Sequence, residues 1–205
     1  YSRTDYQKSE LRKKDLHKDP IFFFLEWMKE AVQLNEEANN FVLSTVDNNA
    51  KPSSRVLLLR GISKKGFTFY TNYSSQKSKE IAYNPNVCMN FFWPTMERQV
   101  RIGGVITKLS KNESLDYFNS RPYASRIGAH SSPQSQEIKS RKFLLQKVDY
   151  YKKKYPNDVP LPNNWGGFIV SPEYIEFWQG RSSRLHDRFL YKKKKNNWTI
   201  IRLAP

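Results

Sequence analysis

The spacing of hydrophobic residues changes early in the chain from a helical period to the two-residue period of strands. Residues 21–34 carry apolar side chains at helical spacing, and Asp19-Pro20 before them supplies an N-cap and a proline at the first helical position. From residue 41 onward apolar and polar residues alternate, which is typical of strands that bury one face. The pattern therefore predicts one helix followed by a largely β-stranded body.

Strand-like segments are separated by turn residues, of which residues 48–51 (Asn-Asn-Ala-Lys) form a hairpin signal. Many short strands joined by hairpins, with helices inserted between them, predict an antiparallel barrel of the α+β class. The predicted strands are residues 41–47, 53–62, 67–72, 87–93, 99–109, 166–170, 174–179, 186–191 and 198–202. The further predicted helices are residues 74–83, 110–118 (opened by a capping-box pattern) and 135–154.

The length of 205 residues suits one domain. Residues 1–18 have no apolar period and are predicted to form a flexible arm ahead of a single domain over residues 19–205. Hydrophobic residues make up 38% of the chain and aromatic residues 15%. A lean core with many aromatic faces fits a protein that completes its burial with a partner subunit and a flat cofactor.

The formal net charge of +16 raises the hypothesis of a nucleic-acid-binding protein. Much of the excess lies in short lysine runs such as residues 192–195, and such runs are most often solvated faces. No zinc-finger spacing, helix-turn-helix wording or RNP-like aromatic pattern accompanies them, so we expect no nucleic-acid partner. A bound anionic cofactor and an anionic substrate would explain part of the positive charge.

The single cysteine, Cys88, excludes an intrachain disulfide and favours a reducing compartment, which we expect to be the cytoplasm. The longest purely apolar run, residues 21–25, is far shorter than a membrane span, and we expect no membrane partner. The chain has neither a Gly-rich dinucleotide fingerprint nor a Walker-type phosphate loop. Motif searching alone therefore does not predict a nucleotide or flavin cofactor.

Residues 176–188 bring a tryptophan, an amide, a glycine, arginines, a histidine and an aspartate close together in the sequence. This mixture suits a site for a flat aromatic ring and an anion. Arginine offers forked donors to phosphate, tryptophan offers a stacking face, and histidine exchanges a proton near neutral pH. An exposed hairpin with solvated charges is the alternative interpretation, but the clustering within a strand-like segment favours a site.

The wording of this segment, Trp-Gln-Gly at 178–180, Arg-Leu-His-Asp-Arg at 184–188 and a terminal Arg-Leu-Ala-Pro, resembles the pyridoxine/pyridoxamine 5′-phosphate oxidases. Other motifs extend the resemblance along the whole chain. It implies the FMN-binding split-barrel fold, FMN as cofactor and a homodimer with shared sites. It also implies oxidation of pyridoxine and pyridoxamine 5′-phosphates to pyridoxal 5′-phosphate, with O2 as acceptor and H2O2 as product.

Residues 55–60 (Arg-Val-Leu-Leu-Leu-Arg) place Arg55, Leu57 and Leu59 on one face of a strand, and the arginines at its two ends could simply be edge charges. The segment resembles the family motif Arg-x-Val-Leu-Leu-Lys, in which the arginine holds the FMN phosphate and the lysine contacts the substrate phosphate. Arg60 stands here in place of that lysine, which keeps the positive charge.

Other cofactor motifs follow. Residues 75–77 (Ser-Gln-Lys) resemble a family Ser-Arg-Lys pair for the FMN phosphate, and Gln76 lacks the family's positive charge. Gln134 and Ser135, which alone could be a helix cap, are implied to contact the cofactor from the second subunit. The resemblance assigns cofactor binding to Arg55, Val56, Leu57, Leu58, Tyr70, Thr71, Gln76, Lys77, Gln99, Gln134, Ser135, Trp178 and Arg188.

The substrate residues are implied by residues 117–129, which resemble the family's Tyr-Phe-x-Ser-Arg-Pro…Ser-x-Ile-Gly-Ala. Within this segment the spacing places Tyr117, Arg121 and Ser125 one and two helical turns apart, so they are predicted to converge on a phosphate. Taken alone, the three could equally form hydrogen bonds among themselves at a helix terminus. Arg184 and His186 are predicted to alternate on one strand face. The resemblance implies that these two are catalytic, with Arg184 over the reacting carbon. It assigns substrate binding to Arg3, Tyr6, Arg60, Tyr117, Arg121, Ser125, Arg184 and His186, the first two in an arm that closes as a lid.

Two other functions stay open. One is a split-barrel flavin enzyme with another substrate, such as the phenazine-pathway oxidases, against which the substrate residues argue. The other is a basic nucleic-acid-binding module without catalysis, which rests only on the charge of +16 and the lysine runs.

Overall fold

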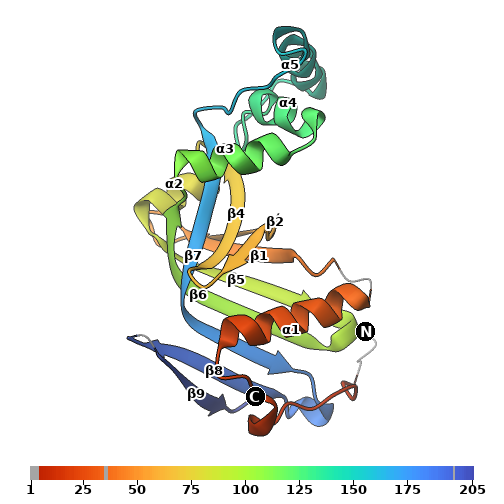
Figure 1. Ribbon diagram of the computed structural model, residues 1–205, viewed down its shortest axis with the longest axis vertical. Coiled ribbons are helices and arrows are strands. Elements are labelled where there is room, and N and C mark those ends of the chain that lie inside the picture. Colours follow the sequence, from red (N-terminus) through yellow and green to blue (C-terminus); the bar gives the residue numbers. More distant parts are fainter. Residues whose placement is uncertain (1–4, 35–36, 196) are drawn as a thin grey trace.

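The computed structural model describes residues 5–34, 37–195 and 197–205. Its body is one curled antiparallel sheet in the order β2-β1-β5-β6-β7-β4-β3, and β8 and β9 continue it from β7 (Figure 1). The strands are β1 (Asn40–Val46), β2 (Pro52–Leu58), β3 (Gly61–Ser63), β4 (Gly66–Asn72), β5 (Asn86–Trp93), β6 (Arg98–Lys108), β7 (Trp165–Gln179), β8 (Asp187–Lys194) and β9 (Asn197–Leu203). The predicted antiparallel α+β architecture is confirmed.

The helices lie around this sheet (Figure 1). They are α1 (Pro20–Gln33), α2 (Gln76–Tyr83), α3 (Lys111–Ser120), α4 (Tyr123–Ser131) and α5 (Arg141–Lys154). Three short 3-10 turns complete the secondary structure at Lys13–Asp15, Pro94–Met96 and Ser182–Arg184. None of the helices in the described parts of the chain is both long and apolar enough to span a membrane.

The longest strand, β7, organises the sheet. It pairs with β6 along most of its length, with β4 through residues 165–170 and with β8 through residues 174–179. Its first residue therefore lies beside the helices α3 and α4, and its last lies beside the C-terminal hairpin at the opposite end of the molecule (Figure 1).

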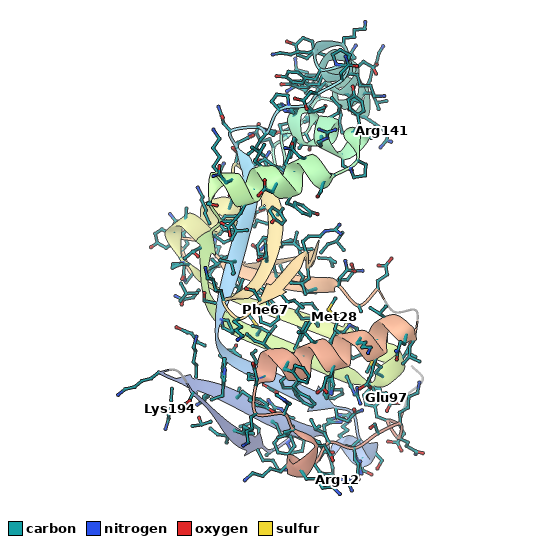
Figure 2. All side chains as sticks on the ribbon, in the orientation of Figure 1. Arg12, Met28, Phe67, Glu97, Arg141 and Lys194 are labelled. Atoms are coloured by element: carbon teal, nitrogen blue, oxygen red, sulfur yellow. The ribbon has the colours of Figure 1, made fainter. Side chains whose placement is uncertain are left out.

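The main core lies between α1 and one face of the sheet. Asp19 caps α1 by accepting a hydrogen bond from the Ile21 N–H at 2.8 Å. The buried stripe of the helix then packs aromatic side chains onto the strands, with Phe24 completely buried against Phe67, Phe91 and Trp93. Figure 2 shows Phe67 close to α1 in the interior. Non-directional burial of these rings is the main stabilising contribution of this layer.

Two strand boundaries differ from the prediction. Residues 53–62 form two strands because the chain changes partner after β2. The Leu59 N–H donates to Asn39 O and the Arg60 N–H to Thr68 O, both at 2.8 Å. The segments 166–170 and 174–179 are instead one strand, because a register shift between Gly103 and Gly104 of β6 lets β7 continue past Pro172. A Cβ on Gly104 would lie 2.1 Å from Ser171 O, so glycine is needed there.

The helical region after β6 also differs from the prediction. A helix over residues 135–154 was expected, but α5 begins at Arg141, after Ser140 accepts a hydrogen bond from the Phe143 N–H. Ser135 has a φ of 67°, which a helix interior excludes. The separate helix α4 was not predicted, since Pro122 had no assigned role as a boundary.

Residues 5–18 run over the sheet rather than away from it. Leu11 is buried in the main core, and its N–H donates to Asp187 at 3.1 Å. The N–H of Lys8 donates to Glu97 at 3.0 Å. Figure 2 places Arg12 and Glu97 at one end of the molecule and Arg141 of α5 at the other.

Phe24→Ala tests the core. It should lower the free energy of unfolding by about 3–5 kcal/mol, because it leaves a cavity among packed rings. Urea denaturation at a fixed protein concentration measures the change. Phe22→Ala is the matched control on the same helix, and Phe22 is 47% exposed. Its cost should be about 1 kcal/mol or less. Equal costs for the two variants would contradict this description of the core.

Candidate functional site

A buried lysine stands at the centre of the first group of polar residues, which we call the Lys77 cluster (Arg55, Thr71, Lys77, Glu80 and Gln134). Lys77 Nζ donates to Thr71 Oγ1 at 3.2 Å, Ser75 Oγ at 3.2 Å and Gln134 Oε1 at 3.3 Å. Burial, and then the charge of Arg55, lower the pKa of Lys77 to about 8, while Glu80 acts in the opposite direction. These three hydrogen-bond partners are neutral, so within the described part of the chain the ammonium makes no direct hydrogen bond to an anion.

Arg55 lies beside this lysine on β2. Its Nη1 donates to Leu43 O and Thr45 Oγ1, and its Nη2 donates to Ser53 Oγ and, at 3.3 Å, to Glu80 Oε2. The neighbouring residue Leu57 faces the same side, whereas Val56 and Leu58 are 65% and 41% exposed on the other face of the sheet. The predicted alternation along β2 is confirmed.

An aromatic wall adjoins the Lys77 cluster. Tyr70 and Tyr117 stack with their ring centroids 3.8 Å apart, and both rings lie nearly parallel to Trp165. The guanidinium of Arg121 lies 4.6 Å from the Trp165 ring centroid. Tyr70, Trp165 and Arg121 border a cavity of about 370 Å³, and its lining also includes Leu57, Thr71, Ser125 and Gln134.

Arg121 is poised for an anion. Its Nη1 is buried and has no hydrogen-bond partner among the described residues. Burial is the main cause that lowers its pKa; Tyr117 opposes the shift, and the nearby charge of Arg60 adds to it. A buried donor without a partner and the positive charge of the nearby Arg60 together favour a bound phosphate at Arg121.

A second group, the Trp178 cluster (Tyr6, Gln99, Trp178, His186 and Arg188), forms around the end of β7. Trp178 pairs with Gln99 of β6 on one side and with Arg188 of β8 on the other. The ring centroids of Trp178 and His186 are 4.6 Å apart, and Tyr6 packs edge-on against Trp178 at 5.7 Å. Arg188 is held by Glu176, with Nε to Oε1 at 2.7 Å, and by Ala204 O, with Nη1 at 2.8 Å.

His186 is held as a neutral ring. Burial and then the charges of Arg184 and Arg188 lower its pKa. Its Nδ1 accepts a hydrogen bond from the Arg181 N–H at 3.1 Å, so the proton of the neutral ring is on Nε2. Nε2 is therefore a hydrogen-bond donor for a polar group of a bound molecule.

The two clusters lie far apart within one chain. Trp165 and Trp178 stand at the two ends of β7, thirteen residues apart, and at about 3.3 Å per residue this corresponds to about 40 Å along the strand. Figure 1 shows these ends at opposite ends of the molecule. Arg188 therefore lies far from Arg55 and Lys77 within a single chain, although all three are predicted to bind the cofactor.

Three geometric expectations are corrected. Arg184 and His186 do not alternate on a strand, because Ser182–Arg184 forms a 3-10 turn with Arg184 at a φ of 62°, and β8 begins only at Asp187. Tyr117, Arg121 and Ser125 do not share one helix, since Arg121 and Pro122 separate α3 from α4.

The third correction concerns Gln134, which was expected to approach the cofactor from a second subunit. It accepts hydrogen bonds from Thr71 and Lys77 of its own chain. Ser135 lines a second cavity of about 590 Å³ together with Gln76 and Glu80. Arg3 lies outside the described residues.

The sequence interpretation missed Glu80 of the Lys77 cluster and two residues that contact members of the site, Trp165 and Glu176. Glu80 follows Gln76 by one helical turn, and the Gln76 side chain donates to it at 2.9 Å, so the i,i+4 spacing was an available signal. Glu176 lies two residues before Trp178 and therefore on the same face of β7. Trp165 had no comparable local signal, because its partners Tyr70, Tyr117 and Arg121 are distant in sequence.

Comparisons with known proteins bear on both clusters. A family model described as pyridoxamine 5′-phosphate oxidase matches residues 28–155, and one described as the pyridoxine 5′-phosphate oxidase C-terminal dimerisation region matches residues 165–205. The pyridoxine/pyridoxamine 5′-phosphate oxidase of Leptospira interrogans is 50% identical over 99% of this chain and 96% of its own length. The pyridoxine/pyridoxamine 5′-phosphate oxidase of Haemophilus influenzae is 48% identical over 99% of this chain and 97% of its own length.

Solved structures show the same fold. PhzG from Burkholderia lata 383, solved in complex with tetrahydrophenazine-1-carboxylic acid, matches with a TM-score of 0.89 and 25% identity over 94% of this chain and 95% of its own. A pyridoxamine 5′-phosphate oxidase-related, FMN binding protein from Nostoc punctiforme matches with a TM-score of 0.74 and 18% identity. The match covers 93% of this chain and 100% of that protein's chain. The predicted split-barrel fold is confirmed by these similarities.

Gly180→Ala should displace the N-terminal arm, because a Cβ at this position would lie 2.7 Å from the Tyr6 ring. We expect trypsin to cleave after Lys8 faster than in the unsubstituted protein. Mass spectrometry of the digest over time measures this rate. Gly128→Ala is the control, since a Cβ there meets nothing within 4 Å. Unchanged cleavage in the Gly180 variant would show that Tyr6 does not hold the arm.

Proposed function

Because the chain belongs to the pyridoxamine 5′-phosphate oxidase family, we propose that it oxidises pyridoxine and pyridoxamine 5′-phosphates to pyridoxal 5′-phosphate with FMN as cofactor and O2 as electron acceptor. The observation that carries the proposal is the cavity beside the Lys77 cluster. Its lining includes Thr71 and Gln134, which accept hydrogen bonds from the buried Lys77 ammonium, and the nearly parallel rings of Tyr70 and Trp165. It also includes Arg121, whose buried Nη1 has no hydrogen-bond partner among the described residues. A phosphorylated flat molecule satisfies all three at once.

The Lys77 cluster fits the cofactor phosphate. Lys77 lacks a direct anionic contact among its hydrogen-bond partners, and Thr71 and Gln134 offer further polar groups beside it. When bound, FMN would accept a hydride from the substrate and pass the electrons to O2. The side chains that would hold it from this side are those of Arg55, Leu57, Tyr70, Thr71, Gln76, Lys77, Gln134 and Ser135. Val56 and Leu58 would lie beside the flavin through their backbone, since their side chains face the other way.

The substrate phosphate would be held by Arg121, Tyr117, Ser125 and Arg60. Arg121 and Ser125 line the same cavity even though they lie on different sides of the helix break. The Trp165 ring fixes the Arg121 guanidinium through a cation–π contact. These groups would bind and orient the phosphate end of the substrate. Fixing that end would hold the reacting carbon in the position that the reaction needs.

The reacting end of the substrate would meet Arg184 and His186. His186 Nε2 would donate to the oxygen substituents of the pyridine ring, and Arg184 would stabilise negative charge that develops on the oxygen at the reacting carbon. Tyr6 and Arg3 of the arm would exclude water from this end. Gln99, Trp178 and Arg188 would contact the cofactor from the same side.

These two sets of residues would meet in a homodimer. The separation of about 40 Å along β7 is too large for one small cofactor to touch both clusters of a single chain. A second copy that places its Trp178 cluster against the first copy's Lys77 cluster closes two equivalent sites. The exposed residues Val56, Leu58 and Phe92 on the outer sheet face supply apolar surface for such a contact.

The direct test is to supply the FMN-loaded protein with pyridoxine 5′-phosphate and with pyridoxamine 5′-phosphate and to measure H2O2 and pyridoxal 5′-phosphate. Both products should form in equal amounts. Unphosphorylated pyridoxine is the control, and it should react far more slowly because Arg121 and Arg60 lose their ligand. Turnover of a reduced phenazine carboxylate in place of the vitamers would favour the phenazine-pathway alternative. A protein that binds no flavin would refute both.

Affinity for FMN should depend on pH through Lys77. Its pKa of about 8 means that the empty site carries the ammonium charge below this pH and loses it above. We therefore expect a nearly constant dissociation constant between about pH 7 and 8, where the phosphate is largely a dianion. Above pH 8 it should rise by up to about tenfold per pH unit, because the phosphate loses its cation. Titration of the apoprotein followed by flavin fluorescence measures this. Lys77→Arg should flatten the profile, and an unchanged profile would locate the titrating group elsewhere.

Complementation tests the shared site. Arg55→Ala and Arg184→Ala homodimers should each be inactive, the first through weaker FMN binding by about 1.5–3 kcal/mol and the second at the chemical step. Mixed dimers should regain about half of the wild-type activity, because one of their two sites contains both arginines. No activity in heterodimers of verified composition would place both arginines of a site on the same chain.

A further inference from the structure

Glu80 is a buried carboxylate inside the Lys77 cluster. Its side chain is 6% exposed, and its oxygens accept hydrogen bonds from Thr45, Ser53 (2.7 Å), Gln76 (2.9 Å) and Arg55 (3.3 Å). Burial acts to raise the pKa of Glu80, but these hydrogen bonds and the charge of Arg55 outweigh it and hold the pKa below its usual range. The carboxylate is therefore ionised at neutral pH, beside the cations that would receive the cofactor phosphate.

Arg55 is fully engaged within the protein. A guanidinium carries two N–H bonds on each Nη. Here Nη1 donates to Leu43 O and Thr45 Oγ1, and Nη2 donates to Ser53 Oγ and Glu80 Oε2. Only Nε is left without one of these partners. A phosphate can receive the usual two-pronged contact from Arg55 only if an internal bond is given up.

The charges of the site follow from these contacts. Arg55 and Lys77 contribute two positive charges, and Glu80 removes one, which leaves a net charge of +1. Gln76 adds none, although the family motif has an arginine at this position. A phosphate monoester carries between one and two negative charges near pH 7, so Arg55, Lys77 and Glu80 alone undercompensate the ligand.

We propose that Glu80 is an internal counter-anion that competes with the cofactor phosphate for Arg55 and thereby lowers the affinity of this chain for FMN. The proposal rests on the proposed function, because it concerns the same phosphate site. Gln76 takes part by donating to the other carboxylate oxygen, so its amide stabilises the Glu80 carboxylate and adds no positive charge to the site. Glu80 is a positioning residue in this scheme and does not touch the cofactor.

Glu80→Gln tests the proposal, because it removes the charge and keeps the shape and one acceptor oxygen. Apoprotein should be titrated with FMN and, in parallel, with riboflavin, which has no phosphate. We expect the dissociation constant for FMN to fall about tenfold and that for riboflavin to stay unchanged. Glu30→Gln is the matched control, since Glu30 also pairs with an arginine (Arg98 Nη1 at 2.7 Å) but belongs to neither cluster.

A second variant keeps the test decisive if Glu80→Gln folds poorly. Gln76→Arg adds a cation next to Glu80 and should also tighten FMN binding without affecting riboflavin. Unchanged or weaker FMN binding in the folded variants, or an equal gain for riboflavin, would overturn the proposal. Failure of the proposed function appears differently, as a wild-type protein that binds no FMN or that binds it and forms no H2O2.

Discussion

The continuous strand β7 is the constraint on which the rest of the structure depends. Its fifteen residues pair with β6 along most of their length and with β4 and β8 at opposite ends, so they join two parts of the sheet into one rigid unit. The same strand carries Trp165 at one end and Trp178 at the other. A strand that is hydrogen-bonded on both sides cannot fold back to bring these residues together. The separation of the two clusters is thus a consequence of backbone pairing, and it makes a second copy part of the chemistry.

The elements of the fold could be predicted where local signals decide them. The Asp19-Pro20 start of α1 and the alternation around Arg55 and Leu57 come from the chain itself, and both are present. The failures occur where distant residues decide. The break after β2 depends on Asn39 and Thr68 as hydrogen-bond partners, and no local pattern in residues 53–62 contains this information.

The candidate site shows the same division. Lys77, Arg121 and Trp178 were identified because each belongs to a segment whose sequence resembles a family motif. The motifs gave no indication that Gln134 would contact Lys77 of its own chain, since 57 residues separate them. The turn at Ser182–Arg184 was missed because its positive φ angles fall on Ser183 and Arg184, which are not the glycines that usually signal such a turn.

Buried carboxylates set the properties of both clusters. Glu80 holds Arg55, and Glu176 holds Arg188 while lying 3.7 Å from Arg101. The two carboxylates differ in charge balance. Glu176 is shared by two arginines, so one positive charge is left uncompensated. Glu80 pairs with Arg55 alone among the arginines of the described residues, and it neutralises that charge. Lys77 must then supply most of the net attraction for a phosphate on its side, and its lowered pKa makes that attraction sensitive to pH. Cofactor retention in this chain should therefore depend on the buried ammonium of Lys77 and the carboxylate of Glu80 as well as on Arg55, the arginine of the family motif.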